Sequence, residues 1–382
     1  MNKIKFIICL LIIHSIIHLA CRKDNNSSNP LHIEKTLRLE PHDGNFRNSE
    51  GDFVWLKDGR LLFIYSYFTL GSHSENSGYL AGRFSSDSGK TWSSEDHLIL
   101  ENEAKLNIKS VSLLRLQDGS IALFYCRNNS NSDCIPMMRI STDETKSWSE
   151  PKSCIQSNGF YALVNDRVIQ LKSGRIIVPV ALAQTTDDMK RNNLRVTDQI
   201  MCFFSDDNGE NWKKSQHIPN PTNIILQEPG VVDLNNGSLL LYCRSNTGVQ
   251  YYSYSNDHGE NWSTAEPSSI RSPRSPASMQ RIPSTGDLLL VWNDNYNYSH
   301  SLSGFRTPLN IAISRDEGKT WIYQKILEDD PMGWFCYIAI EFTANKVILA
   351  YSAGTRRGKS KKLATEQVTR VDIDWLYFDV IH

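Results

Sequence analysis

The sequence has little net charge and few long hydrophobic runs. Its 41 Lys and Arg nearly balance its 42 Asp and Glu, so the formal charge at pH 7 is -1. A chain so close to neutral has no electrostatic basis for nucleic acid as its main partner. Mean hydropathy is -0.40, and one long apolar run stands near the start, which excludes a multi-span membrane protein. Hydrophobic residues still make up 40% of the chain, enough to exclude intrinsic disorder.

Cysteine pairs with metal-binding spacing are also absent. The chain has 8 Cys but no CxxC pair, so we expect no metal and no cofactor. Several of the later cysteines lie inside apolar runs and are interpreted as buried strand residues. Cys126 and Cys134 stand close enough for a hairpin disulfide in an exported protein, but buried thiols are the favoured interpretation.

Helical periodicity and interdomain linkers are missing as well. No segment has a convincing helical period, and no Pro- or Ser-rich stretch interrupts the chain after its start. We therefore expect a single all-β domain over residues 33–382.

The first residues predict export. Met1 to Lys5 is basic, Phe6 to Leu19 is mostly apolar, and Leu19-Ala20-Cys21 resembles a bacterial lipobox. We expect a signal peptide over 1–20, a lipidated Cys21, and a flexible polar tether over 21–32. The protein would then be an exported lipoprotein of the outer membrane or periplasm. An ordinary signal peptide with an incidental cysteine is the alternative.

One motif recurs along the chain, Ser-x-Asp-x-Gly-x-x-Trp. Intact copies begin at Ser85, Ser205, Ser255 and Ser314, and a fifth at Ser141 has Thr145 in place of Gly. Successive copies begin 56, 64, 50 and 59 residues apart, a period typical of repeat architectures. Ser and Asp can hydrogen-bond a tight turn, Gly supplies a positive φ, and Trp packs the turn onto strands. We therefore expect a structural role for these aspartates.

A second pattern, apolar run, turn, apolar run, predicts β-hairpins. Six copies begin at Phe53, Ser112, Val168, Val231, Gln280 and Ala339. Each hairpin with the hairpin that follows it would make one four-stranded antiparallel blade, so we predict a six-bladed β-propeller. The last blade would take its outer strands from residues 368–380 and from the N-terminal stretch after Ile33, which closes the ring.

The Trp motif resembles the Asp box of sialidases (neuraminidases), and the six-unit layout is similar to their propeller. The resemblance covers nearly all of residues 33–382, so the chain is identified as a member of the sialidase superfamily with BNR repeats, in a lipoprotein form. It implies an exo-acting glycoside hydrolase that cleaves terminal sialic acid, with a sialylated or other acidic glycan as substrate. Fold alone does not fix function, which depends on the site.

The resemblance also implies the residues of that site. Sialidases bind the substrate carboxylate with three arginines, because guanidinium binds carboxylate bidentately and stays charged. A tyrosine is the nucleophile and a glutamate its base, since a neutral phenol is not repelled by the substrate carboxylate. The matching positions are Arg47, Arg244, Arg306, Glu228 and Tyr337.

The proton donor departs from the family pattern. The resemblance implies an aspartate in the loop before the first Trp motif, but residues 71–78 contain none. Glu75 is the predicted acid, with His73, Glu50 and Asp52 as alternatives. Three residues that open inner strands are further candidates for substrate binding: Asp52, Asp166 and Arg167. Arg274 is a candidate for the rim.

Two other classes of function stay open. One is a related propeller enzyme that acts on another acidic sugar, by hydrolysis or elimination. The other is a non-catalytic glycan-binding lipoprotein. Asn48-Ser49 after Arg47, where the family has Ile-Pro, favours these alternatives. In each case we expect a monomer held at a membrane by its lipid, with no nucleic acid partner.

Overall fold

The computed structural model describes residues 32–69, 77–183, 198–221, 224–295, 305–358 and 361–378. The predicted signal peptide, Cys21, His73 and Glu75 lie outside these ranges. Residues His32–His382 form one compact unit. In the described ranges its regular structure is β-strand apart from one short 3-10 helix, η2 (Asp374–Tyr377). None of the described helices is long and apolar enough to cross a bilayer.

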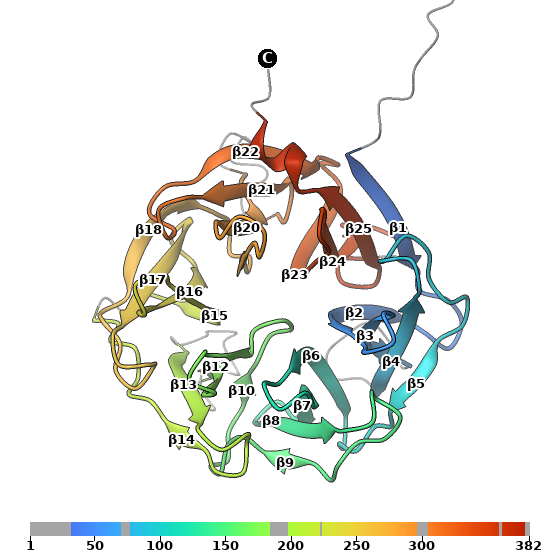
Figure 1. Cartoon of the computed structure of the whole chain (residues 1–382), viewed down its shortest axis with the longest axis horizontal. Coiled ribbons are helices and arrows are strands. Elements are labelled where there is room, and N and C mark those ends of the chain that lie inside the picture. The colour runs from blue at the N-terminus through green and yellow to red at the C-terminus, as the bar shows by residue number, and fades with distance from the viewer. Residues whose placement is uncertain are drawn as a thin grey trace, which may run out of the picture. The chain divides into compact units, whose positions relative to one another are not determined.

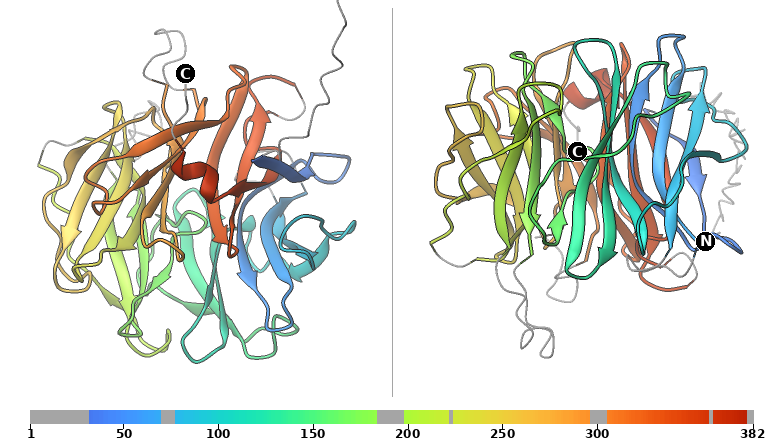
Figure 2. Two further views of the ribbon diagram at one scale, coloured as in Figure 1. Left: turned by 45° about the horizontal axis from the view of Figure 1, so that its top comes forward. Right: turned by 90° about the horizontal axis from the view of Figure 1, so that it is seen from below.

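Within this unit the sheets follow one another around a ring (Figure 1). Strands β2, β6, β15 and β23 lie nearest the middle, and β1, β5, β9, β14, β18 and β22 lie at the rim. Edge-on views show neighbouring sheets standing side by side (Figure 2). The pairing orders the strands into five sheets.

The first sheet joins the two ends of the compact unit. Its order is β1-β25-β24-β23, and Ile33 of β1 pairs antiparallel with Val371 of β25. The predicted closure by the segments after Ile33 and after residue 368 is therefore confirmed. The strands are β1 (Ile33–Leu39), β23 (Gly333–Phe342), β24 (Lys346–Thr355) and β25 (Glu366–Asp372).

The largest sheet has eight strands. Two antiparallel runs, β2 to β5 and β6 to β9, are joined where Gly78 of β4 pairs parallel with Asn107 of β6. The strands are β2 (Arg47–Trp55), β3 (Leu61–Phe68), β4 (Gly78–Ser85), β5 (His97–Leu100), β6 (Asn107–Arg115), β7 (Ile121–Ser130), β8 (Asp133–Ser141) and β9 (Lys152–Ser153).

The remaining sheets have five, four and four strands. The five-stranded sheet consists of β10 (Tyr161–Ala162), β11 (Ile169–Gln170), β12 (Ile176–Leu182), β13 (Gln199–Ser205) and β14 (Lys213–Lys214). The next consists of β15 (Leu226–Asp233), β16 (Leu239–Ser245), β17 (Val249–Ser255) and β18 (Glu266–Arg271). The last consists of β19 (Ser278–Arg281), β20 (Leu288–Asn293), β21 (Leu309–Ser314) and β22 (Ile322–Glu328).

The prediction of six four-stranded blades is wrong. The described strands form five sheets, of which three are four-stranded, one is five-stranded and one is eight-stranded. Two local features cause the difference. The Gly78–Asn107 pair merges two runs that the turn pattern predicted as separate blades. The inner edge next to β12 is broken into β10 and β11, which both pair with β12. The six predicted hairpins themselves are confirmed as antiparallel pairs.

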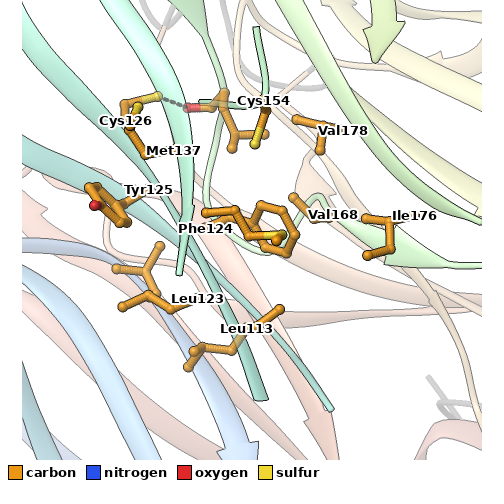
Figure 3. Packing of buried hydrophobic residues seen from close by; sticks show 14 of the residues in the cluster. Leu113, Leu123, Phe124, Tyr125, Cys126, Met137, Cys154, Val168, Ile176 and Val178 are labelled. Carbon is orange, nitrogen blue, oxygen red and sulfur yellow. Dashed lines mark hydrogen bonds between the residues drawn. The ribbon is translucent and has the colours of Figure 1, made fainter. Parts of the chain in front are cut away.

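Apolar clusters bury the faces between neighbouring sheets. Figure 3 shows Leu113 and Phe124 of the eight-stranded sheet packed with Val168 and Val178 of the next sheet. Each fully buried aliphatic side chain contributes about 1.5–3 kcal/mol relative to exposure. Because both faces are covered, β3 and β16 are buried along their whole length, which explains their continuous apolar sequence. The six cysteines in the described ranges are buried and free, as predicted.

The repeated Trp motif forms a hydrogen-bonded turn. In the copy at Ser205, Asp207 accepts hydrogen bonds from the backbone N–H and the side-chain amide of Asn211, both at 2.8 Å. Ser205 Oγ accepts from Gly209 N at 2.8 Å, and Trp212 Nε1 donates to Gly209 O at 3.1 Å. These contacts agree with the structural role predicted for the motif aspartates.

Candidate functional site

A pocket of about 490 Å³ collects side chains from the inner strands β2, β6, β15 and β23. Four of the residues predicted for the site line it: Arg47, Glu228, Arg244 and Tyr337. They are separated by up to 290 positions in the sequence, so only the ring arrangement brings them together. Residues 361–363, just before β25, form another part of the wall.

A shared backbone feature turns side chains toward the middle of the ring. Several inner-strand residues other than glycine have φ between 53° and 62°, and the strand register shifts beside four of them. They are Glu50, Ser110, Asp166, Glu228 and Tyr337. Such conformations cost of order 1–3 kcal/mol each and cluster at functional sites. A β-bulge re-aims a side chain. Four of these five residues line the pocket: Glu50, Ser110, Glu228 and Tyr337.

Tyr337 and Glu228 form the central contact. The Tyr337 hydroxyl donates a hydrogen bond to Glu228 Oε1 at 2.9 Å. Glu228 Oε2 lies 2.9 Å from Arg244 Nη1 in an ion pair. The second Arg244 nitrogen, Nη2, donates to Gln227 Oε1 at 3.2 Å. A carboxylate held between a phenol and a guanidinium can accept the phenol proton.

Burial raises the pKa of Tyr337 above its ordinary value, and the negative charge of Glu228 raises it further, against the opposing effect of Arg306 and Arg244. Tyr337 is therefore neutral in the resting site. It becomes a competent nucleophile only if its proton passes to a base as the bond forms, and Glu228 is within reach to accept it.

Arg306 lies over the ring of the same tyrosine. Its guanidinium carbon is 5.2 Å from the centre of the Tyr337 ring and 5.3 Å from that of Trp334. Its Nη1 is buried with no hydrogen-bond partner. A buried guanidinium N–H without an acceptor is costly, so this atom is suited to a ligand oxygen.

Arg47 is held by Glu50. The two side chains form a close ion pair, and Ser110 donates to the other Glu50 oxygen. Burial acts to raise the pKa of Glu50, but Arg47, Lys109 and the hydrogen bonds outweigh it and lower that pKa. Glu50 therefore keeps its negative charge, which suits it to positioning Arg47 and makes it a poor proton donor.

Four predicted residues do not line this pocket. One is Arg306, although its guanidinium lies over the Tyr337 ring. Asp52 accepts hydrogen bonds from the backbone of Phe53 and Leu113, both at 2.7 Å. Asp166 accepts from Ile340 N at 2.9 Å. Arg167 donates to Ala277 O at 2.6 Å. These contacts join different inner strands to one another. Glu75, the predicted acid, is outside the described residues.

Sequence reasoning missed several residues of the pocket wall. They are Lys109, Ser110, Asp198, Gln227, Lys361 and Lys362. Arg274, considered for the rim, donates to Gln227 Oε1 at 2.6 Å. Some of these residues could have been found from a polar pair at the start of an otherwise apolar inner strand. Lys109-Ser110 and Gln227-Glu228 are such pairs.

The described residues include no group of three or more His, Cys, Asp or Glu arranged to hold a metal ion.

Comparison with known proteins places the chain in a family. The model of the BNR repeat-like domain matches residues 108–361. A sialidase of Clostridium perfringens is 27% identical over 253 residues, which are 59% of this chain and 63% of that protein. The chain thus spans less than two thirds of this relative's length.

Solved structures share the fold at low identity. A protein of unknown function from Dyadobacter fermentans has a TM-score of 0.69 at 19% identity, covering 89% of this chain and 99% of its own. The Hadza microbial sialidase Hz136 also has a TM-score of 0.69 at 19% identity, covering 87% of this chain and 67% of its own. Because the domain match spans more than half of the sequence, the chain belongs to the BNR repeat-like family of the sialidase superfamily.

Proposed function

We propose that the chain is an exo-acting glycoside hydrolase of sialidase type that removes a terminal sialic acid from glycans. The observation that carries the proposal is the 2.9 Å hydrogen bond from Tyr337 to Glu228. Arg47 and Arg244 line the same pocket, and Arg306 stacks on the Tyr337 ring. The curated relatives that match are sialidases, which supports the same reaction.

In the proposed reaction the Tyr337 oxygen attacks the anomeric carbon while Glu228 Oε1 accepts the phenol proton. The bond from the anomeric carbon to the leaving oxygen breaks, and that oxygen takes a proton from a general acid. Water then attacks the anomeric carbon and gives a proton to the ionised general acid. The bond from that carbon to the Tyr337 oxygen breaks, the tyrosine recovers its proton from Glu228, and the sugar is released with retained configuration. The arginines hold the substrate carboxylate, and their positive charges also stabilise a phenolate developing on Tyr337.

Glu75 remains our proposal for the general acid. Glu50 is less suited, because the neighbouring Arg47 keeps its carboxylate ionised. The substitution Glu75→Gln should slow a substrate with a poor leaving group much more than one with a good leaving group, because the latter needs no protonation.

The direct test is hydrolysis of a fluorogenic sialoside beside a panel of fluorogenic uronosides. We expect release of the fluorophore from the sialoside alone, and loss of that activity in Tyr337→Phe. Cleavage of a uronoside alone would assign the chain to the other acidic-sugar class. Binding of sialosides without turnover would support a glycan-binding protein.

We also propose that Cys21 is lipidated and anchors the protein to a membrane, which rests on Leu19-Ala20-Cys21 and the polar segment after it. The substitution Cys21→Ser should move the protein from the detergent phase to the aqueous phase in a phase-partition assay. Retention of the Cys21→Ser variant in the detergent phase would overturn the proposal.

A further inference from the structure

Among the residues that the structure describes, the pocket wall carries more positive than negative charge. Its cationic residues are Arg47, Lys109, Arg244, Lys361 and Lys362, and its acidic residues are Glu50, Asp198 and Glu228. Two of the acids are already paired, Glu50 with Arg47 and Glu228 with Arg244. A single substrate carboxylate leaves positive charge in the pocket unmatched, although the whole chain has a formal charge of -1.

Lys109 is the unusual member of this set. Its exposed fraction is 9%, and lysine is rarely so buried unless it is paired. Within the described ranges no carboxylate lies within ion-pair distance of its ammonium group. Glu50, the nearest acid that influences it, has its two oxygens occupied by Arg47 and Ser110. Lys109 therefore lines the pocket as a buried residue whose ammonium group has no ion-pair partner among the described residues.

The surroundings of Lys109 favour a ligand over water. Its Nζ lies 5.8 Å from the centre of the Phe160 ring, and Lys109 pairs across the strands with Cys126, which also lines the pocket. An ammonium group beside apolar surface binds anions more strongly than one in bulk water, because less solvent screens the interaction.

We propose that Lys109 binds a second anionic group of the substrate, so that the preferred sugar carries an O-sulfate besides the carboxylate held by the arginines. This inference rests on the proposed function only in placing an acidic sugar in the pocket. Lys109 lies on β6 and Tyr337 on β23, which belong to different sheets.

The test is calorimetric titration of the wild-type protein with free sialic acid and with its mono-O-sulfated isomers. We expect at least one isomer to bind roughly tenfold or more tightly than sialic acid, the scale of one hydrogen bond to a charged group. Lys109→Met and Lys109→Gln should both bring the ratio of the two affinities close to one, so that the sulfated isomer is no longer preferred over sialic acid. Lys109→Arg should retain part of it. Lys213→Met, which removes an exposed lysine from β14, is the matched control and should keep the full preference.

Equal affinity for every sugar, no binding at all, or a preference that survives in both neutral variants would overturn the proposal. Its failure is distinguishable from that of the proposed function. Hydrolysis of an unsulfated sialoside without any Lys109-dependent preference would refute only the role of Lys109. A Lys109-dependent preference in a protein that hydrolyses no sialoside would refute only the proposed reaction.

Discussion

Glu228 contacts a hydroxyl group and a guanidinium group, those of Tyr337 and Arg244. Its Oε1 accepts from Tyr337, and its Oε2 pairs with Arg244, each at 2.9 Å. The guanidinium holds one carboxylate oxygen while the other faces the Tyr337 hydroxyl. A substrate carboxylate that engages Arg244 would draw positive charge away from Glu228, so substrate binding and activation of Tyr337 are linked through this residue.

The substitution Glu228→Gln tests this role. It keeps the shape of the side chain but removes the base, so kcat should fall by roughly 10²- to 10⁴-fold. The melting temperature should also fall, because glutamine can still accept from Tyr337 but leaves the buried Arg244 guanidinium without its ion-pair partner. Steady-state kinetics measure the effect, with Glu210→Gln, an exposed residue paired with Lys152, as the control. Turnover within threefold of wild type would show that Glu228 is not the base.

Sequence reasoning identified the reacting residues better than it identified the other residues of the pocket wall. Arg47, Arg244, Glu228 and Tyr337 were found because motif order assigns them to inner strands, and all four line the pocket. Asp52 was also assigned to an inner strand, yet it binds backbone N–H groups of Phe53 and Leu113. Which inner-strand side chains turn into the pocket depends on backbone conformation at each bulge, and that is not encoded in residue type.

The inner strands β2, β15 and β23 share a β-bulge. Glu50, Glu228 and Tyr337 each occupy a left-handed conformation, and register shifts lie between Ser49 and Asp52, between Gln227 and Gly230, and between Cys336 and Ala339. Antiparallel pairing on both sides of each bulge holds the strained residue in place. The strain is thus maintained by strand pairing rather than by the pocket side chains themselves.

The turn at Ser141 offers a test at the level of one element. Thr145 has a φ of 69° at the position where the other copies have glycine with φ from 79° to 90°. A β-branched residue in this region costs about 1–2 kcal/mol, partly offset by the greater unfolded-state entropy of glycine. Thr145→Gly should therefore stabilise the protein by up to about 1 kcal/mol, measured by denaturant unfolding.

The reciprocal change is its control. Gly259→Thr places a side chain at a φ of 90°, with its Cβ 3.3 Å from Ile177 Cδ1, and should destabilise the protein. If Thr145→Gly lowered stability instead, the threonine would have to make contacts that outweigh its backbone strain.

Turn chemistry predicted the hairpins correctly but not the number of sheets. Sequences such as Asp58-Gly59 and Asn236-Gly237 define which strands are joined by tight turns. They contain no information on a contact such as Gly78 with Asn107, which depends on how closely two neighbouring runs approach.

Across the whole ring, buried carboxylates join strands from different sheets. Asp52, Asp166 and Glu341 influence one another electrostatically, and Asp166 binds the backbone of β23 through Ile340. Burial raises the pKa of Glu341 to about 7 and that of Asp166 to about 7. Ring stability should therefore depend on pH near neutrality.

For Glu341 the folded protein keeps its proton up to about pH 7, whereas the unfolded chain loses it near the ordinary value of 4.5. The stability contributed by this group is present below pH 4.5 and is lost as pH rises toward 7. Glu341→Gln should then be stabilised relative to wild type by up to roughly 3 kcal/mol at pH 8, and by little at pH 4.5. Thermal unfolding at both pH values measures this, with exposed Glu266→Gln as control. A difference independent of pH would contradict the assignment.

The central claim is that strands from separate sheets assemble one nucleophilic site at Tyr337. Its most direct test is incubation with a sialic acid derivative that carries fluorine at the anomeric carbon and at the neighbouring carbon. The second fluorine slows breakdown of a covalent intermediate, so the glycosyl-enzyme accumulates. Peptide mass spectrometry should locate one sugar adduct on Tyr337, and Tyr337→Phe should carry none. An adduct on another residue, or unimpaired turnover in Tyr337→Phe, would contradict the account.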